Sequence, residues 1–231
     1  MENNAYFCRK CLYMETKAAT LREKTEFKKD VQEYGPIGEQ RLAQILTYRG
    51  RKFEDTTNIP AFRPFDIDFI YYEDKNLTYR DLLKEYYNGK DGKDLAIKTY
   101  ECKTDTVGIE SRNIAYEDIS NSNPGCLARS KADYVFFVFI DSKTKVVKEE
   151  YMIDLHALRW WLCTNFYKIN VETFVKNKET GQKKKLIEAK SMRRGKDNTG
   201  IFLLDIDYLV EYSKENKNKH YGNIVVYSQK F

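Results

Sequence analysis

The chain has 231 residues, of which 42% are apolar, 14% aromatic and 32% charged, and its formal net charge is +5. This composition excludes a disordered chain, and no apolar run approaches the roughly 18 residues that a membrane-spanning helix requires. The mild excess of Lys and Arg favours a partner rich in phosphate, although a solvated lysine-rich surface has the same composition.

The N-terminal part is predicted to be helical. Residues 15–34 are charged and moderately periodic, and Gly35-Pro36 breaks that pattern. Residues 37–49 then place apolar side chains on one stripe of a second helix. Glu39 stands in the first turn of this helix, where an acid is favourable by about 0.3–1 kcal/mol. It could equally serve as an auxiliary acid of a functional site, and the sequence leaves both interpretations open.

The middle of the chain predicts a sheet with strands at about 65–72, 95–103, 113–118 and 133–140. The last of these is apolar on both faces, which is typical of a strand in the middle of a sheet. Between the first two strands, residues 79–87 are apolar at helical spacing and predict an inserted helix.

The C-terminal third predicts further strands and helices. A strand at 146–153 precedes a helix that Asp154 can cap, and 201–204, 207–212 and 223–228 are predicted as strand, helix and strand. Residues 167–200 predict a basic peripheral hairpin or loop. Its densest basic clusters are Lys183, Lys184, Lys185, Arg193 and Arg194. They could contact a nucleic-acid backbone, or they could simply form a solvated turn. The fold class is α/β, with a central mixed sheet flanked by helices.

The triplet Glu101-Cys102-Lys103 is the most informative feature of the sequence. Side chains alternate along a strand, so Glu101 and Lys103 share one face and Cys102 takes the other. Asp66 and Asp68 alternate in the same way on the preceding predicted strand. If the two strands pair, carboxylates and an ammonium group meet in a small space. Carboxylates suit Mg²⁺, and a metal at a phosphate suits phosphodiester hydrolysis. An ion pair on a solvated strand, worth about 0–1 kcal/mol, is the simpler alternative.

The order of these motifs resembles that of the PD-(D/E)XK nuclease superfamily, in particular its small phage and prokaryotic nucleases and Holliday junction resolvases. The resemblance covers about residues 36–141. It rests on an aspartate opening one strand, the run Glu101-Cys102-Lys103-Thr104-Asp105 on the next, Glu117 ending a short strand, and Lys131-Ala132-Asp133 leading into an apolar strand. A helix with an acidic residue, here Glu39, is also common in this superfamily.

The resemblance implies a restriction-endonuclease-like core at about 36–155 within a single domain spanning 1–231. Residues 1–35 would form an N-terminal helical extension, and extra elements would follow the core. It also implies a Mg²⁺-dependent endodeoxyribonuclease, with Mn²⁺ as a substitute, that acts on DNA and is structure-specific or resolvase-like. An RNA endonuclease, or a catalytically inactive protein that binds nucleic acid or a host factor, remains an alternative. We expect a cytoplasmic protein, in the host cell if phage-encoded, with no membrane partner and with a homodimer as an option.

In this interpretation Asp66 and Glu101 hold the metal with the backbone carbonyl of Cys102, and Lys103 stabilises the transition state. Glu117 would complete the catalytic set, and Lys131 would be an auxiliary basic group, with an ordinary surface lysine as its alternative. The choice between Asp66 and Asp68 stays open, because Pro64 precedes Asp66 by two positions and not by one. Asp66 is favoured because it opens the predicted strand.

Overall fold

The computed structural model describes residues 33–50, 52–107, 112–118, 123–169, 174–176, 181, 183–194 and 197–231. These residues form two compact units. A six-strand unit comprises the described parts of 26–108, 129–155 and 225–231, and a four-strand unit comprises those of 109–128 and 156–224. The predicted N-terminal helix at 15–34, with Cys8 and Cys11 before it, lies almost wholly outside the described residues. The expectation of a single domain stays a prediction.

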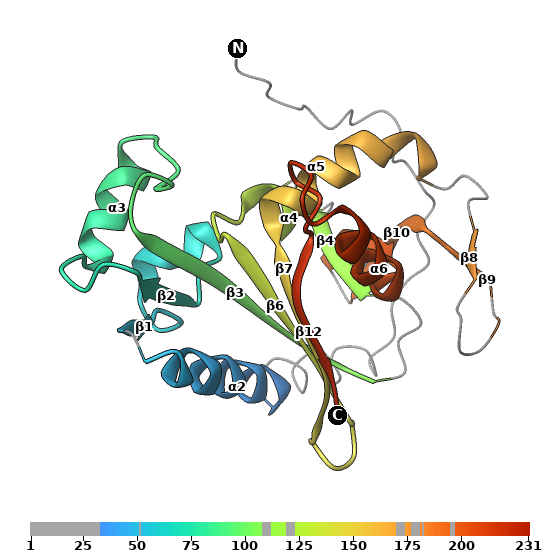
Figure 1. The fold of residues 1–231 in the computed structure, drawn as a ribbon, viewed down its shortest axis with the longest axis horizontal. Helices are drawn as coiled ribbons and strands as arrows, with labels where there is room; N and C mark the ends of the chain where they lie inside the picture. The colour runs from blue at the N-terminus through green and yellow to red at the C-terminus, as the bar shows by residue number, and fades with distance from the viewer. Residues whose placement is uncertain are drawn as a thin grey trace. The chain divides into compact units, whose positions relative to one another are not determined.

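The six-strand unit is built on a mixed sheet, as predicted (Figure 1). All of its neighbouring strands are antiparallel except β3 and β6, which run parallel. In spatial order the strands are β1 (Phe53–Asp55), β2 (Phe69–Tyr72), β3 (Ile97–Thr106), β6 (Tyr134–Ile140), β7 (Val147–Asp154) and β12 (Val225–Lys230).

The strand β6 lies in the interior of this sheet. Six of its seven side chains, from Val135 to Ile140, are buried, which confirms the prediction made from its apolar run. Because β6 pairs with β3 on one side and β7 on the other, its backbone donors and acceptors are satisfied within the sheet.

Helix α2 (Gly35–Tyr48) corresponds to the helix predicted at 37–49. Pro36 lies within its first turn, where the missing N–H costs nothing. The helix buries Leu42 and Leu46 in the core of the six-strand unit, and Gly38 is its closest approach to the sheet. A Cβ atom at Gly38 would lie 2.1 Å from Thr104 Oγ1 and 3.1 Å from Cys102 Sγ, so β3 leaves no room for a side chain there.

The segment between β2 and β3 contains the predicted inserted helix, α3 (Tyr79–Tyr87). Thr78 and Asp81 form a capping box at its start, and Leu82 and Tyr86 face inward. These two residues belong to a second apolar cluster of the six-strand unit, together with Phe62 and Ile70.

The strand boundary beside the candidate aspartates was predicted wrongly. The strand expected at 65–72 begins at Phe69, and residues Pro60–Phe65 form a 3-10 helix, η3, instead. Two prolines within this short segment remove backbone donors and fix φ, which disfavours a strand. Asp66 follows in the left-handed region, with φ 51° and ψ 50°. Asp66 and Asp68 therefore do not share a strand face as expected.

The four-strand unit has its own antiparallel sheet. The order is β10 (Ile187–Arg194), β11 (Asp197–Leu204), β4 (Arg112–Asp118) and β5 (Asn123–Pro124). We expected β4 in the central sheet, but it pairs with β11 and β5. The two neighbours of β3 are β2 and β6, so β3 has no open edge for β4.

The predicted basic segment contains two hairpins. One pairs β8 (Phe174–Lys176) with β9 (Lys183–Lys185), and the other pairs β10 with β11. Asp205 accepts a hydrogen bond from Tyr208 N at 2.8 Å and caps the following helix. The helical elements between 126 and 216 are α4 (Cys126–Arg129), α5 (Leu155–Asn165), η4 (Phe166–Lys168) and α6 (Ile206–Asn216). None of the helices that the structure describes is long and apolar enough to cross a membrane.

Candidate functional site

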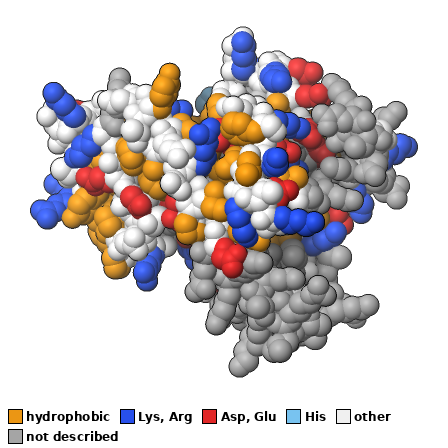
Figure 2. All heavy atoms as spheres, turned by 90° about the horizontal axis from the view of Figure 1, so that it is seen from below, with side chains coloured by type: hydrophobic (Ala, Val, Ile, Leu, Met, Phe, Trp, Pro, Cys, Tyr) orange, Lys and Arg blue, Asp and Glu red, His pale blue; other side chains and the backbone are white. Residues whose placement is uncertain are grey.

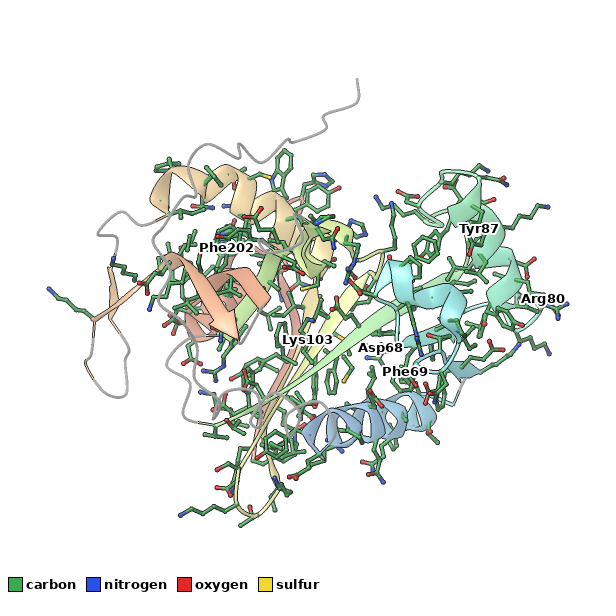
Figure 3. The ribbon with its side chains drawn as sticks, turned by 180° about the vertical axis from the view of Figure 1, so that it is seen from behind. Asp68, Phe69, Arg80, Tyr87, Lys103 and Phe202 are labelled. Carbon is green, nitrogen blue, oxygen red and sulfur yellow. The ribbon has the colours of Figure 1, made fainter. Side chains whose placement is uncertain are left out.

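The pairing of β2 with β3 brings Asp68 to Glu101. The register places Phe69 opposite Tyr100, and continuing it by one residue places Asp68 opposite Glu101. Asp68 N donates to Tyr100 O at 2.8 Å, and Asp68 Oδ2 accepts from Cys102 N at 2.7 Å. These two bonds fix both the backbone and the carboxylate of Asp68 against β3 (Figure 3).

Glu101 and Lys103 share one face of β3, as the alternation predicted. Lys103 Nζ lies 2.7 Å from Glu101 Oε1. The Glu101 side chain is only 6% exposed, whereas that of Lys103 is 32% exposed, so the ammonium group marks the solvent side of the pair. Glu101 Oε2 is buried without a hydrogen-bond partner among the described residues. A buried carboxylate oxygen is costly to leave unsatisfied, which indicates room for an additional donor or cation.

Negative charge is concentrated around Asp68. The pKa of Asp68 is raised to about 6. Burial is the largest cause, and the carboxylates of Glu101 and Glu39 also raise it, whereas the Cys102 N–H and the Lys103 ammonium lower it. The pKa of Glu39 is also raised, first by burial and then by Asp55. Three acids and one lysine therefore interact electrostatically, with Glu39 contributing from α2. Its role as an auxiliary acid of a functional site stays a prediction.

The thiol of Cys102 lies on the opposite face of β3 from the side chains of Glu101 and Lys103. It packs against the core cluster beneath α2, and burial raises its pKa well above the ordinary value. The sequence suggested the carbonyl oxygen of Cys102, and not its thiol, as a metal ligand. The protonation of the buried thiol therefore does not bear on that prediction.

Asp66 is held by an arginine that the sequence analysis did not identify. Arg129 Nε donates to Asp66 Oδ2 at 2.9 Å, and an Arg129 terminal nitrogen donates to Oδ1 at 2.7 Å. Both carboxylate oxygens of Asp66 are therefore engaged in one bidentate pair. Only the adjacent basic motif at Lys131 pointed to this part of the chain, and nothing in the sequence indicated which acid Arg129 would bind.

Lys131 is anchored to the same turn through its backbone. Its N–H donates to Phe65 O at 2.8 Å, while its side chain is exposed. Asp133, which completes the Lys-Ala-Asp motif, accepts from Thr99 N at 2.8 Å and from Thr99 Oγ1 at 3.0 Å. Asp133 therefore fixes the start of β6 to β3, and the role of Lys131 at a phosphate stays a prediction.

Glu117 belongs to the other unit. It lies on β4, opposite Gly200 on β11 and Pro124 on β5. Its membership of the catalytic set stays a prediction.

The basic clusters lie on the two hairpins of the four-strand unit. Lys183 on β9 is exposed, and Lys185 is half-buried. The side chains of Lys184, Arg193 and Arg194 lie outside what the structure describes. Elsewhere, Lys and Arg side chains are interspersed with Asp and Glu across the face seen in Figure 2. Binding of nucleic acid by these clusters stays a prediction.

The metal-binding capacity of the site rests on two carboxylates. In the described parts of the chain, no three His, Cys, Asp or Glu side chains are arranged to hold a metal ion together. Mg²⁺ does not require such a set, because it keeps several waters and commonly binds through one or two carboxylates and substrate phosphates. The oxygen atoms that such an ion could use here are those of Asp68 and Glu101 and the carbonyl oxygen of Cys102, and metal binding by them stays a prediction.

Comparison with known proteins does not identify a family for this chain. No family model, curated protein or solved structure matches the chain.

Proposed function

We propose that the chain is a metal-dependent endonuclease that hydrolyses phosphodiester bonds in DNA, with its site on β3. The observation that carries the proposal is the group formed by Asp68, Glu101 and Lys103, in which a buried oxygen of Glu101 lacks a partner among the described residues. That oxygen is free to accept from a water or to bind a cation.

Asp68 and Glu101 would hold a divalent cation with the carbonyl oxygen of Cys102. When bound, such an ion neutralises charge on the scissile phosphate and acidifies water at the site. We assign the principal aspartate to Asp68 and not to Asp66, because Arg129 occupies both carboxylate oxygens of Asp66. Asp66 therefore acts in this proposal as the partner of Arg129.

Lys103 supplies the positive charge that the chain itself contributes. Its ion pair with Glu101 aims the ammonium group toward the more exposed side of the site. There it can donate to a phosphate oxygen or orient the attacking water, and stabilise the charge that develops in the transition state. Glu39 adds negative charge from α2, which strengthens cation binding and raises the proton affinity of Asp68.

A cleavage panel tests the proposal. The substrates are supercoiled DNA, linear duplex, single strands, a four-way junction and RNA, each with Mg²⁺, with Mn²⁺ and with EDTA. We expect metal-dependent cleavage of at least one DNA substrate and none in EDTA. Cleavage confined to RNA would move the chain to the alternative ribonuclease, and binding without cleavage would support the inactive alternative.

A further inference from the structure

The exposed face of α3 carries a stripe of two cations and one aromatic ring. Arg80, Lys84 and Tyr87 are spaced i, i+4 and i+7, so they lie on one side of the helix, and all three are exposed. Arg80 and Tyr87 are labelled on this helix in Figure 3. Tyr87 is 70% exposed, so most of its ring is open to solvent.

The acids of the same helix are already engaged. Asp81 accepts two hydrogen bonds from Thr78, and Glu85 pairs with Lys90 at 3.2 Å. At helical spacing these two acids lie to the side of the stripe, whose own three residues include two cations and no acid.

The ring of Tyr87 packs against Phe65. It meets Phe65 edge to face, with 6.1 Å between the ring centroids and 70° between the planes. Phe65 also packs against Tyr86 at 4.8 Å, within the apolar contacts that anchor α3. A ring fixed in this way offers a flat surface at low entropic cost.

This platform belongs to the same unit as the candidate site. Phe65 precedes Asp68 by three residues, a reach of at most about 11 Å along the chain. Between them lies Asp66 with its bound Arg129, whose side chain is 45% exposed, and the backbone of Lys131 is tied to Phe65. Phe65, which contacts Tyr87, is thus joined by a short stretch of chain to the residues of the candidate site.

We infer that α3 binds an unpaired segment of the DNA strand, with one base stacked on Tyr87 and the backbone phosphates on Arg80 and Lys84. Stacking on an exposed aromatic ring requires a free base face, which an unpaired nucleotide offers and a paired one inside a duplex does not. The inference rests on the proposed function, because the same strand would then pass to Asp68 and Glu101.

The test measures binding of the full chain to labelled oligonucleotides by fluorescence anisotropy, in EDTA so that no cleavage occurs. The ligands are a single strand, a blunt duplex of the same sequence, and that duplex with a single-stranded tail. Tyr87→Ala should weaken binding to the single strand and the tailed duplex by roughly 5- to 150-fold, and should leave the blunt duplex unaffected. Tyr87→Phe keeps the ring and its packing on Phe65, and it should bind as the wild type does.

Two further variants complete the design. Tyr48→Ala, at a tyrosine on α2 that is 94% exposed, is the control and should change nothing. Arg80→Ala with Lys84→Ala should lower the salt slope of single-strand binding by about 0.7 for each phosphate that the variant no longer neutralises.

The inference is overturned if Tyr87→Ala binds the single strand as the wild type does, or if it loses equal affinity for the blunt duplex. A failure of this inference can be distinguished from a failure of the proposed nuclease activity. A wild type that binds the single strand through Tyr87 and never cuts would contradict the proposed function alone. A chain that cuts DNA with Tyr87→Ala unimpaired in single-strand binding would contradict this inference alone.

Discussion

Lys103 is the residue whose replacement separates a catalytic triplet from an ordinary ion pair. Lys103→Ala should reduce turnover by at least about 100-fold, because it removes one positioned charge from the transition state. Metal affinity, measured by calorimetry, should change little, since both carboxylates remain.

The chain contains a matched control for this substitution. Glu188-Ala189-Lys190 on β10 has the same spacing, and Lys190 Nζ lies 3.3 Å from Glu188 Oε1 with 48% of its side chain exposed. Lys190→Ala should leave turnover unchanged. An active Lys103→Ala enzyme would show that both triplets are only strand ion pairs.

The two aspartates should differ in their effect on metal binding. Asp68→Asn removes charge beside Glu101 and should abolish the stabilisation that Mg²⁺ gives to the folded chain in thermal unfolding. Asp66→Asn weakens a pair with Arg129 and should leave that stabilisation largely in place. The opposite ranking would return the ligand role to Asp66.

At the scale of single residues, the sequence predicted what depends on strand alternation alone. Glu101 and Lys103 share a face of β3, and Cys102 takes the other, as expected. The choice between Asp66 and Asp68 could not be made in advance. It depends on the left-handed backbone at Asp66 and on an arginine 63 residues away in the sequence.

Among the elements, the packing of α2 on β3 determines where Glu39 stands. Gly38→Ala should destabilise the fold by about 1–3 kcal/mol, because its Cβ atom would lie 2.1 Å from Thr104 Oγ1. Gly35→Ala is the control, since no atom lies within 4 Å of a Cβ at that position. Urea denaturation compares the two.

A second substitution checks that the cause is this close approach. Thr104→Ala removes the hydroxyl that the new Cβ atom would meet, so it should recover part of the stability in the Gly38→Ala background. Additive destabilisation in the double variant would mean that the effect arises from the helix backbone and not from α2 against β3.

Elements formed by interactions between residues close in the sequence could be predicted, whereas those that depend on distant residues could not. The helix α3 and the strand β6 follow from local periodicity and were confirmed. The start of β2 was wrong because two prolines in η3 override the alternating pattern of residues 65–69. The placement of β4 in a second sheet depends on its distant partner β11, which no local pattern reveals.

For the whole molecule, Asp68 should make stability depend on pH. Its folded pKa of about 6 lies above the ordinary value of 3.8, so the folded state disfavours the ionised form. The stability that protonated Asp68 contributes is therefore fully present below about pH 4. It is lost as pH rises through about 6, and the loss is on the order of 3 kcal/mol. Asp68→Asn should remove this loss.

The measurement is the free energy of unfolding in EDTA, for wild type and Asp68→Asn, at about pH 4 and about pH 7.5. The variant should gain stability relative to the wild type as pH rises. If the two proteins differed in unfolding free energy by the same amount at both pH values, the Asp68 carboxylate would not be held in a charged, buried cluster.

The most direct test of the central claim is DNA cleavage by the wild type and by Lys103→Ala, with Mg²⁺ and with EDTA, beside Lys190→Ala. The account predicts metal-dependent cleavage by the wild type and by Lys190→Ala, and a reduction of at least about 100-fold in Lys103→Ala. Full activity of the wild type in EDTA, or undiminished activity of Lys103→Ala, would contradict it.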